Sequence, residues 1–137
     1  MGGDPKLLAD TRAWLVKAGN DLRAAVTDMA ASPPLLEDAL FHCQQAAEKA
    51  MKALLTWHDR PFRKTHDLVE VGGQCVEIDP TLEPLLRRAA PLTEYAWKFR
   101  YPGEPEEVSR DEAEEAIALA REVCEGILLR LPAENDP

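Results

Sequence analysis

Basic side chains and one histidine gather in a short stretch of the chain that contains no acidic residue. Within residues 60–66 these side chains are Arg60, Arg63, Lys64 and His66. Arginine, lysine and protonated imidazole donate hydrogen bonds to phosphate oxygens, so the stretch could bind an anion. If Thr65 caps a following helix, His66 lies in its first turn, where free backbone N–H groups also favour negative charge. The alternative is a solvated loop with a capping histidine.

Arg100 and Tyr101 form a second candidate pair, at the end of a predicted helix. The guanidinium of Arg100 offers a fork of donors suited to phosphate or carboxylate, and Tyr101 offers a ring for stacking or a hydroxyl. A structural role is equally consistent with the sequence, with Arg100 bound to helical carbonyls or a glutamate and Tyr101 covering the end of the fold. We expect the loop before His66 and the helix end at Arg100 to converge on one pocket for negatively charged groups.

A third group of polar side chains follows one face of the segment 41–55. Its members are Gln45, Glu48, Lys49 and Lys52. Glu48 precedes Lys52 by four residues, which is the favourable order for an ion pair along a helix. The group by itself is typical of an exposed helix surface, and we expect it to be solvated.

The other chemistry-bearing residues match no catalytic or metal-binding motif. The sequence contains no nucleophile beside its base, no paired carboxylates and no glycine-rich phosphate loop. His42, His58 and His66 lie sixteen and eight residues apart, which is not the spacing of metal ligands. We therefore expect no metal and no cofactor, and the sequence leaves open whether the protein is an enzyme.

Composition indicates an ordinary globular domain of 137 residues, with 45% hydrophobic and 30% charged residues. The net charge of −9 disfavours long-range attraction to nucleic acid or to an anionic membrane. No apolar run approaches the ~20 residues that cross a bilayer, and the first residues lack a basic leader, so we expect a cytoplasmic protein without a membrane segment. The three cysteines, Cys43, Cys75 and Cys124, show no CxxC spacing and are expected to be buried thiols.

The segment 41–55 is the predicted centre of the fold. Its apolar residues recur at alternating steps of three and four, the spacing of one buried face of an α-helix. They are Cys43, Ala47, Ala50, Met51 and Leu54, and they continue a stripe that begins at Leu36 and Leu40. Because many of these positions and their neighbours are alanine, another helix can approach closely, as is typical of a central bundle helix.

Capping residues and prolines set the expected ends of the first two helices. Asp4 and Pro5 begin a long first helix, since aspartate caps and proline suits a first turn. The prolines within residues 30–34 end it. Ser32 is expected to cap the central helix, which runs to about Trp57.

The middle of the chain predicts a short helix and then a long one. Thr65 is the expected cap of the short third helix, which Gly72 and Gly73 should weaken so that it frays after one or two turns. Asp79 and the proline after it begin a fourth helix. Its apolar stripe continues through Pro91, so we expect a kink there.

The last helix has the clearest start. Residues 100–108 form a loop, and Ser109 with Glu112 three residues later is a capping box. No strand pattern, repeat or linker is present in the sequence. We therefore predict an all-α fold, an up-and-down bundle of four long helices with an additional short helix, as a single domain over residues 1–131. Residues 132–137 are expected to be a flexible acidic tail.

Three segments of the sequence resemble the HEPN family of small helical domains. They are QQAAEKAMKALL at residues 44–55, THDL at 65–68 and RYP at 100–102. The resemblance implies a helical bundle that forms a homodimer and is encoded beside, or fused to, a minimal nucleotidyltransferase. Members act as toxins of toxin–antitoxin pairs or as nucleotide-binding partners.

The toxin members of this family resemble metal-independent ribonucleases, whose signature is an arginine followed four to six residues later by a histidine. Arg60 and His66 match that spacing, with Pro61 after the arginine and Leu68 where toxin members carry a tyrosine. In such chemistry the histidine moves a proton and the arginine stabilises the phosphorane charge. The resemblance thus gives His66, with Arg60 or Arg100, as candidate catalytic residues.

The sequence as a whole favours a HEPN module that binds a nucleotide or phosphate-bearing ligand and works with a separate minimal nucleotidyltransferase. The expected ligand-binding residues are Arg60, Arg63, Lys64, His66, Arg100 and Tyr101. A metal-independent ribonuclease toxin that acts on RNA and a purely structural interaction domain are the two alternatives.

Overall fold

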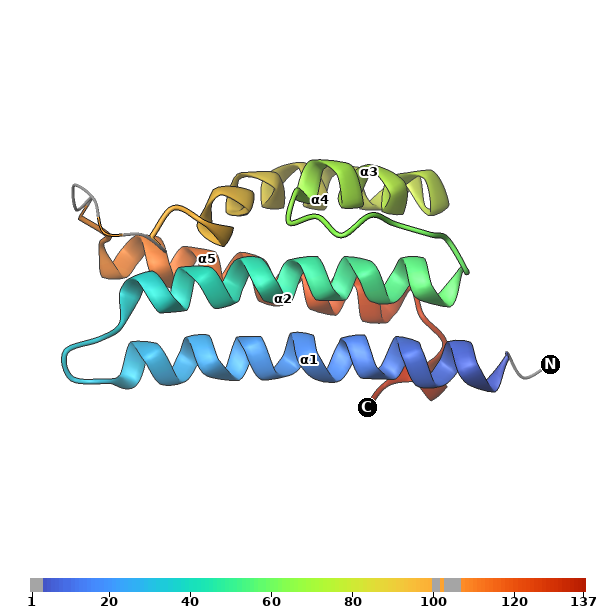
Figure 1. Ribbon diagram of the computed structural model, residues 1–137, viewed down its shortest axis with the longest axis horizontal. Helices are drawn as coiled ribbons and strands as arrows, with labels where there is room; N and C mark the ends of the chain where they lie inside the picture. The colour runs from blue at the N-terminus through green and yellow to red at the C-terminus, as the bar shows by residue number, and fades with distance from the viewer. Residues whose placement is uncertain (1–3, 100–101, 103–106) are drawn as a thin grey trace.

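The computed structural model describes residues 4–99, 102 and 107–137, and within them every regular element is helical. The three longest helices are α1 (Pro5–Ala30), α2 (Leu36–Trp57) and α5 (Arg110–Leu129). Figure 1 shows α1 and α2 antiparallel, with α5 and the shorter helix α3 also against α2, and α4 packs on α3 and α5. The all-α prediction is confirmed. In place of four long helices, the described residues contain three.

Helix α2 is the centre of the molecule, as its sequence predicts. It contacts α1, α3 and α5. Leu40, Met51 and Leu54 are almost fully buried, and so are the alanines at positions 39, 46, 47, 50 and 53. The small side chains allow neighbouring backbones to pack closely around α2 on several sides. The three cysteines are buried as expected, and burial raises the pKa of each thiol to about 12, so they stay protonated.

The start of α1 agrees with the prediction, but the start of α2 does not. The Asp4 carboxylate accepts a hydrogen bond from the backbone N–H of Lys6. Ser32, by contrast, does not cap α2, which begins four residues later without a side-chain cap. Glu37 and Asp38 stand in its first turn instead, where their charges favour the positive end of the helix dipole.

Helix α3 (Leu68–Ile78) starts later and is longer than the sequence suggests. Its cap is Asp67, whose carboxylate accepts from the N–H of Val69, so the prediction of Thr65 as the cap was wrong. The expected fraying is also wrong, since α3 extends over 11 residues. Gly72 is buried against α4, so tertiary packing outweighs the low helix propensity of the glycines.

The predicted fourth helix is divided in two. Asp79 caps a 3-10 turn, Pro80–Leu82, which leads into α4 (Glu83–Ala89). The chain then continues as 3-10 turns over Ala90–Ala96. Pro91 explains the change, because its ring lacks an N–H and clashes with the carbonyl one turn earlier in an α-helix.

The C-terminal part begins as expected. The Ser109 hydroxyl accepts a hydrogen bond from the N–H of Glu112 at 3.0 Å, which confirms the cap of α5. Residues 132–137, expected to be loose, include a 3-10 turn at Ala133–Asn135 that contacts α1, and Asn135 is buried. Among the described residues, no helix is both long and apolar enough to span a membrane.

Gly73 gives a direct test of how α3 is stabilised. A Cβ at this helical position would meet no atom within 4 Å. Gly73→Ala should therefore raise the free energy of unfolding by about 0.5–1 kcal/mol, because alanine loses less backbone entropy in a helix. Urea unfolding followed by circular dichroism measures the change. Gly19→Ala, at an equally open position in α1, is the control, and a loss of stability confined to the Gly73 variant would show that α3 is not a regular helix there.

Candidate ligand-binding site around His66

The chain between α2 and α3 runs back along α2 (Figure 1), and His66 of this segment contacts α2. The Nδ1 atom of His66 lies 2.7 Å from Oε1 of Glu48. The side-chain amide of Gln44 donates to the backbone carbonyl of His66 at 3.0 Å. The Glu48 side chain is only 4% exposed, whereas that of His66 is 59% exposed. A buried carboxylate therefore holds one edge of an imidazole whose other edge faces solvent.

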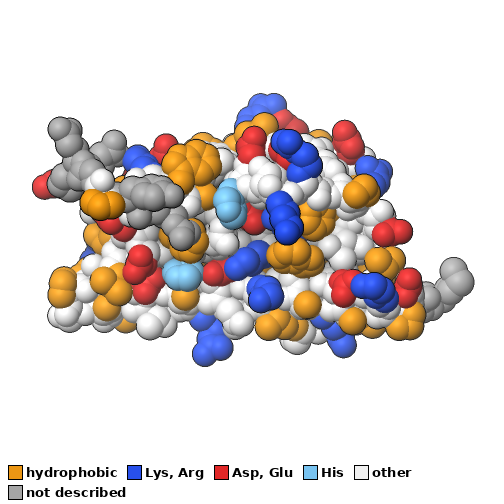
Figure 2. Space-filling model, in the orientation of Figure 1, with side chains coloured by type: hydrophobic (Ala, Val, Ile, Leu, Met, Phe, Trp, Pro, Cys, Tyr) orange, Lys and Arg blue, Asp and Glu red, His pale blue; other side chains and the backbone are white. Residues whose placement is uncertain are grey.

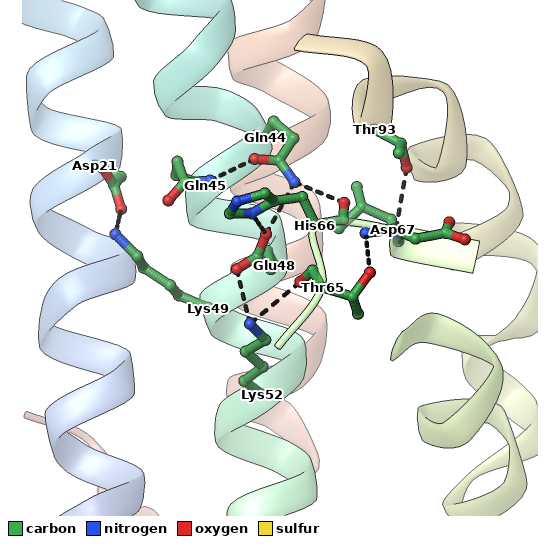
Figure 3. A network of polar contacts seen from close by, with 11 residues as sticks. Asp21, Gln44, Gln45, Glu48, Lys49, Lys52, Thr65, His66, Asp67 and Thr93 are labelled. Atoms are coloured by element: carbon green, nitrogen blue, oxygen red, sulfur yellow. Dashed lines mark hydrogen bonds and ion pairs between the residues drawn. The ribbon is translucent and has the colours of Figure 1, made fainter. Parts of the chain in front are cut away.

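Glu48 has two further donors, both from its own helix (Figure 3). The amide of Gln44 donates to Oε1 at 3.1 Å, and Nζ of Lys52 donates to Oε2 at 2.9 Å. Lys52 also donates to the Thr65 carbonyl at 3.3 Å. The prediction that this polar face is solvated was wrong for Glu48 and Lys52, because the connection between α2 and α3 covers them.

Two aromatic rings complete the environment of Lys52. Its Nζ lies 5.6 Å from the ring centre of Trp14 and 5.5 Å from that of Phe62. A cation over aromatic faces is attracted by their quadrupoles, and the attraction strengthens away from water. Lys52 therefore joins α1 and the connecting segment to the buried carboxylate on α2.

The charge state of Glu48 follows from these contacts. Burial alone would raise the pKa of Glu48, but hydrogen bonds from Lys52, His66 and Gln44 outweigh it and hold the pKa below the ordinary glutamate value. The carboxylate is thus ionised at neutral pH and can only accept hydrogen bonds. The Nδ1 atom of His66 must then carry a proton, which leaves Nε2 as an acceptor in neutral imidazole and a donor in the protonated form.

A second histidine is held in the same way beside the first. Asp21 of α1 lies 2.9 Å from Nδ1 of His42 and accepts from Nζ of Lys49 at 2.6 Å. The Asp21 side chain is 11% exposed. Gln45 lies between the two groups and donates to the amide oxygen of Gln44 at 2.6 Å. Figure 3 shows the Asp21–Lys49 pair alongside the network of Glu48.

The predicted basic residues surround His66 only in part. Arg60 pairs with Glu77 at 3.5 Å, and Arg63 forms two-pronged contacts with Glu70, both acids belonging to α3. Lys64 is exposed and has no ion-pair partner within the part of the chain that the structure describes. These arginine side chains remain largely exposed, and surface pairs of this kind are weak. Figure 2 shows basic and histidine side chains beside one another on this face, with acidic groups among them.

Arg100 and Tyr101 lie outside the described residues, so their convergence with His66 stays a prediction. The sequence pattern gives no site role to Asp21, His42 or Gln44. The usable signal was the spacing of Gln44, Glu48 and Lys52 at intervals of four residues, which puts three polar side chains on one line of a helix otherwise rich in alanine.

Comparison with known proteins gives one positive result. Residues 11–130 match the model of the HEPN domain family, and the chain belongs to that family. A search of curated proteins and a search of solved structures each returned no significant match.

The charge of Glu48 can be tested through stability. Glu48→Gln should lower the free energy of unfolding by about 3 kcal/mol at pH 7, because Lys52 is left buried without its counter-ion. The folded protein favours the ionised carboxylate. The stabilisation that Glu48 provides in the wild type is therefore fully present above the usual glutamate pKa of about 4.3, and it is lost as the pH falls through the lower pKa of the folded state. Urea unfolding from pH 7 down to pH 3 should show the two proteins converging.

The matched control is Glu77→Gln, since Glu77 is exposed and pairs with exposed Arg60. That variant should change stability little at any of these pH values. A stability difference for Glu48→Gln that stays constant across the pH range would contradict an ionised buried carboxylate.

Proposed function

We propose that the protein is a HEPN module that binds a nucleotide or another phosphate-bearing ligand at His66 and works with a separate minimal nucleotidyltransferase. The observation that carries this proposal is the imidazole of His66, oriented by buried Glu48 and open to solvent on its other edge. A surface histidine that only filled space would need no buried partner. Burying an ion is costly, so this arrangement favours a role for the exposed edge.

The neighbouring groups suit a phosphate. Lys64 is free of ion pairs among the described residues, and Arg63 is exposed on the same segment. Its pair with Glu70 is a surface pair that a phosphate could replace at little cost, since the guanidinium fork binds phosphate as well as carboxylate. In this proposal Arg60, Arg100 and Tyr101 also contribute to the pocket.

Membership of the family supports the proposed assembly. Many HEPN domains form homodimers, and many are encoded beside minimal nucleotidyltransferases. A homodimer of this chain would carry two copies of the His66 site. The net charge of −9 suits a protein partner or a small ligand better than a long nucleic acid, and we place the pair in the cytoplasm.

Binding can be measured by calorimetric titration with ATP, GTP and a short RNA. We expect at least one of them to bind, and His66→Ala to weaken the affinity roughly tenfold or more, as for loss of a hydrogen bond to a charged group. Circular dichroism would establish that the variant is folded. His58→Ala, which removes a histidine outside the network, should bind as the wild type does.

Two outcomes would count against this site. One is the absence of binding by all three ligands, which would favour a purely structural interaction domain. The other is unchanged binding by the double variant His66→Ala with Arg100→Ala.

The second candidate function is a metal-independent ribonuclease toxin. The hydrogen bond between Glu48 and Nδ1 of His66 favours it, because a carboxylate that fixes the tautomer leaves Nε2 ready to take a proton from an RNA 2′-hydroxyl. Arg60 or Arg100 would stabilise the developing phosphorane charge. Induced expression in a bacterial host should then arrest growth and degrade RNA, and His66→Ala should relieve both effects. Normal growth with intact RNA on induction would exclude the toxin.

A further inference from the structure

A groove lies beside the His66 site, where the first turns of α2 meet the 3-10 segment Ala90–Ala96. Its volume is about 400 Å³, within the usual range for small-ligand sites. It is lined by Glu37, Asp38, Phe41, His42, Tyr95 and Phe99. We call it the aromatic groove. None of its lining residues belongs to the proposed phosphate site.

Three aromatic rings give the groove an apolar lining. Tyr95 and Phe99 lie nearly parallel, with ring centres 6.1 Å apart and an interplanar angle of 16°. Phe41 meets the imidazole of His42 edge-on at 5.5 Å. Burial, with Glu112 nearby, raises the pKa of Tyr95 to about 12, so its ring is neutral at physiological pH. Half-buried neutral rings of this kind are surfaces on which nucleobases stack.

The groove also presents two carboxylates. Glu37 and Asp38 are exposed, and neither has an ion-pair or hydrogen-bond partner among the described residues. A carboxylate accepts two N–H bonds side by side. Guanine offers such a pair on its Watson–Crick edge, from N1 and the N2 amino group, whereas adenine offers only its N6 amino group there. Free acceptors beside stacking rings therefore favour guanine.

The same charges fix the direction of a bound nucleotide. The carboxylates of Glu37 and Asp38 would repel a phosphate from the aromatic groove. Lys49 and His66 lie further along α2, where they contact Asp21 and Glu48. Glu48 follows His42 by six residues of α2, which corresponds to about 9 Å of rise along the helix axis. A base in the groove thus places its phosphate towards His66.

We propose that the aromatic groove binds the base of the nucleotide, with guanine preferred over adenine, while the phosphate lies at His66. This inference rests on the proposed nucleotide site and adds the class of base that it recognises. The rings of Tyr95 and Phe99 hold the base by stacking, and the carboxylates of Glu37 and Asp38 bind its edge.

The test is a titration of the full chain with GMP, AMP and ribose 5-phosphate, followed by amide chemical shifts in NMR. GMP should bind roughly tenfold or more tightly than ribose 5-phosphate, the gain expected for one stacked base, and several times more tightly than AMP. The double variant Glu37→Gln with Asp38→Asn should reduce GMP affinity to that of AMP and should not weaken the binding of ribose 5-phosphate. Tyr95→Leu should weaken both nucleotides and spare ribose 5-phosphate.

Asp111→Asn, which removes a first-turn acid from α5 instead, is the matched control and should keep the preference for GMP. Equal affinities for GMP and ribose 5-phosphate, both lost in His66→Ala, would overturn the base site and leave the phosphate site standing. GMP binding that survives His66→Ala but is lost in the double variant would support the base site and overturn the phosphate site. A preference for GMP that the double variant retains would overturn the role of the carboxylates.

Discussion

The buried carboxylate of Glu48 determines how the rest of the site is arranged. Taking an ion out of water costs several kcal/mol unless well-placed donors replace the water. Here Gln44 and Lys52 donate from the same helix, and His66 donates from the segment that leads to α3. Because that segment supplies one of the donors, it must lie along α2 for Glu48 to be satisfied. The need of the Glu48 carboxylate for hydrogen-bond donors therefore holds the segment that carries His66 against α2.

His42 and His66 are held by the same kind of contacts but have different surroundings. In each, a carboxylate holds Nδ1 and a lysine neutralises the carboxylate, with Asp21 and Lys49 serving His42 as Glu48 and Lys52 serve His66. The surroundings differ in charge, since basic side chains flank His66 whereas Glu37 and Asp38 lie near His42. A ligand with a neutral ring at one end and a phosphate at the other matches that gradient.

The helices were largely predictable from the sequence because their signals are local. Asp4 and Ser109 cap as their types predict, and the apolar period of 41–55 identified the most buried helix. Thr65 failed as a cap because Asp67 competes two residues later. Burial of Glu48 could not be read from periodicity, since the segment that covers it is irregular and leaves no periodic pattern. The sequence singled out His66 as a candidate but assigned Glu48, whose carboxylate orients it, to an exposed helix surface.

The orientation of His66 by Glu48 is the claim on which this description of the site depends, and the nitrogen chemical shifts of the imidazole measure it directly. Free histidine prefers the neutral tautomer with its proton on Nε2. In the folded protein at neutral pH, ¹⁵N NMR should show the proton of His66 on Nδ1, and Glu48→Gln should remove that preference. An Nε2-protonated imidazole in the wild type, unaffected by Glu48→Gln, would contradict the account.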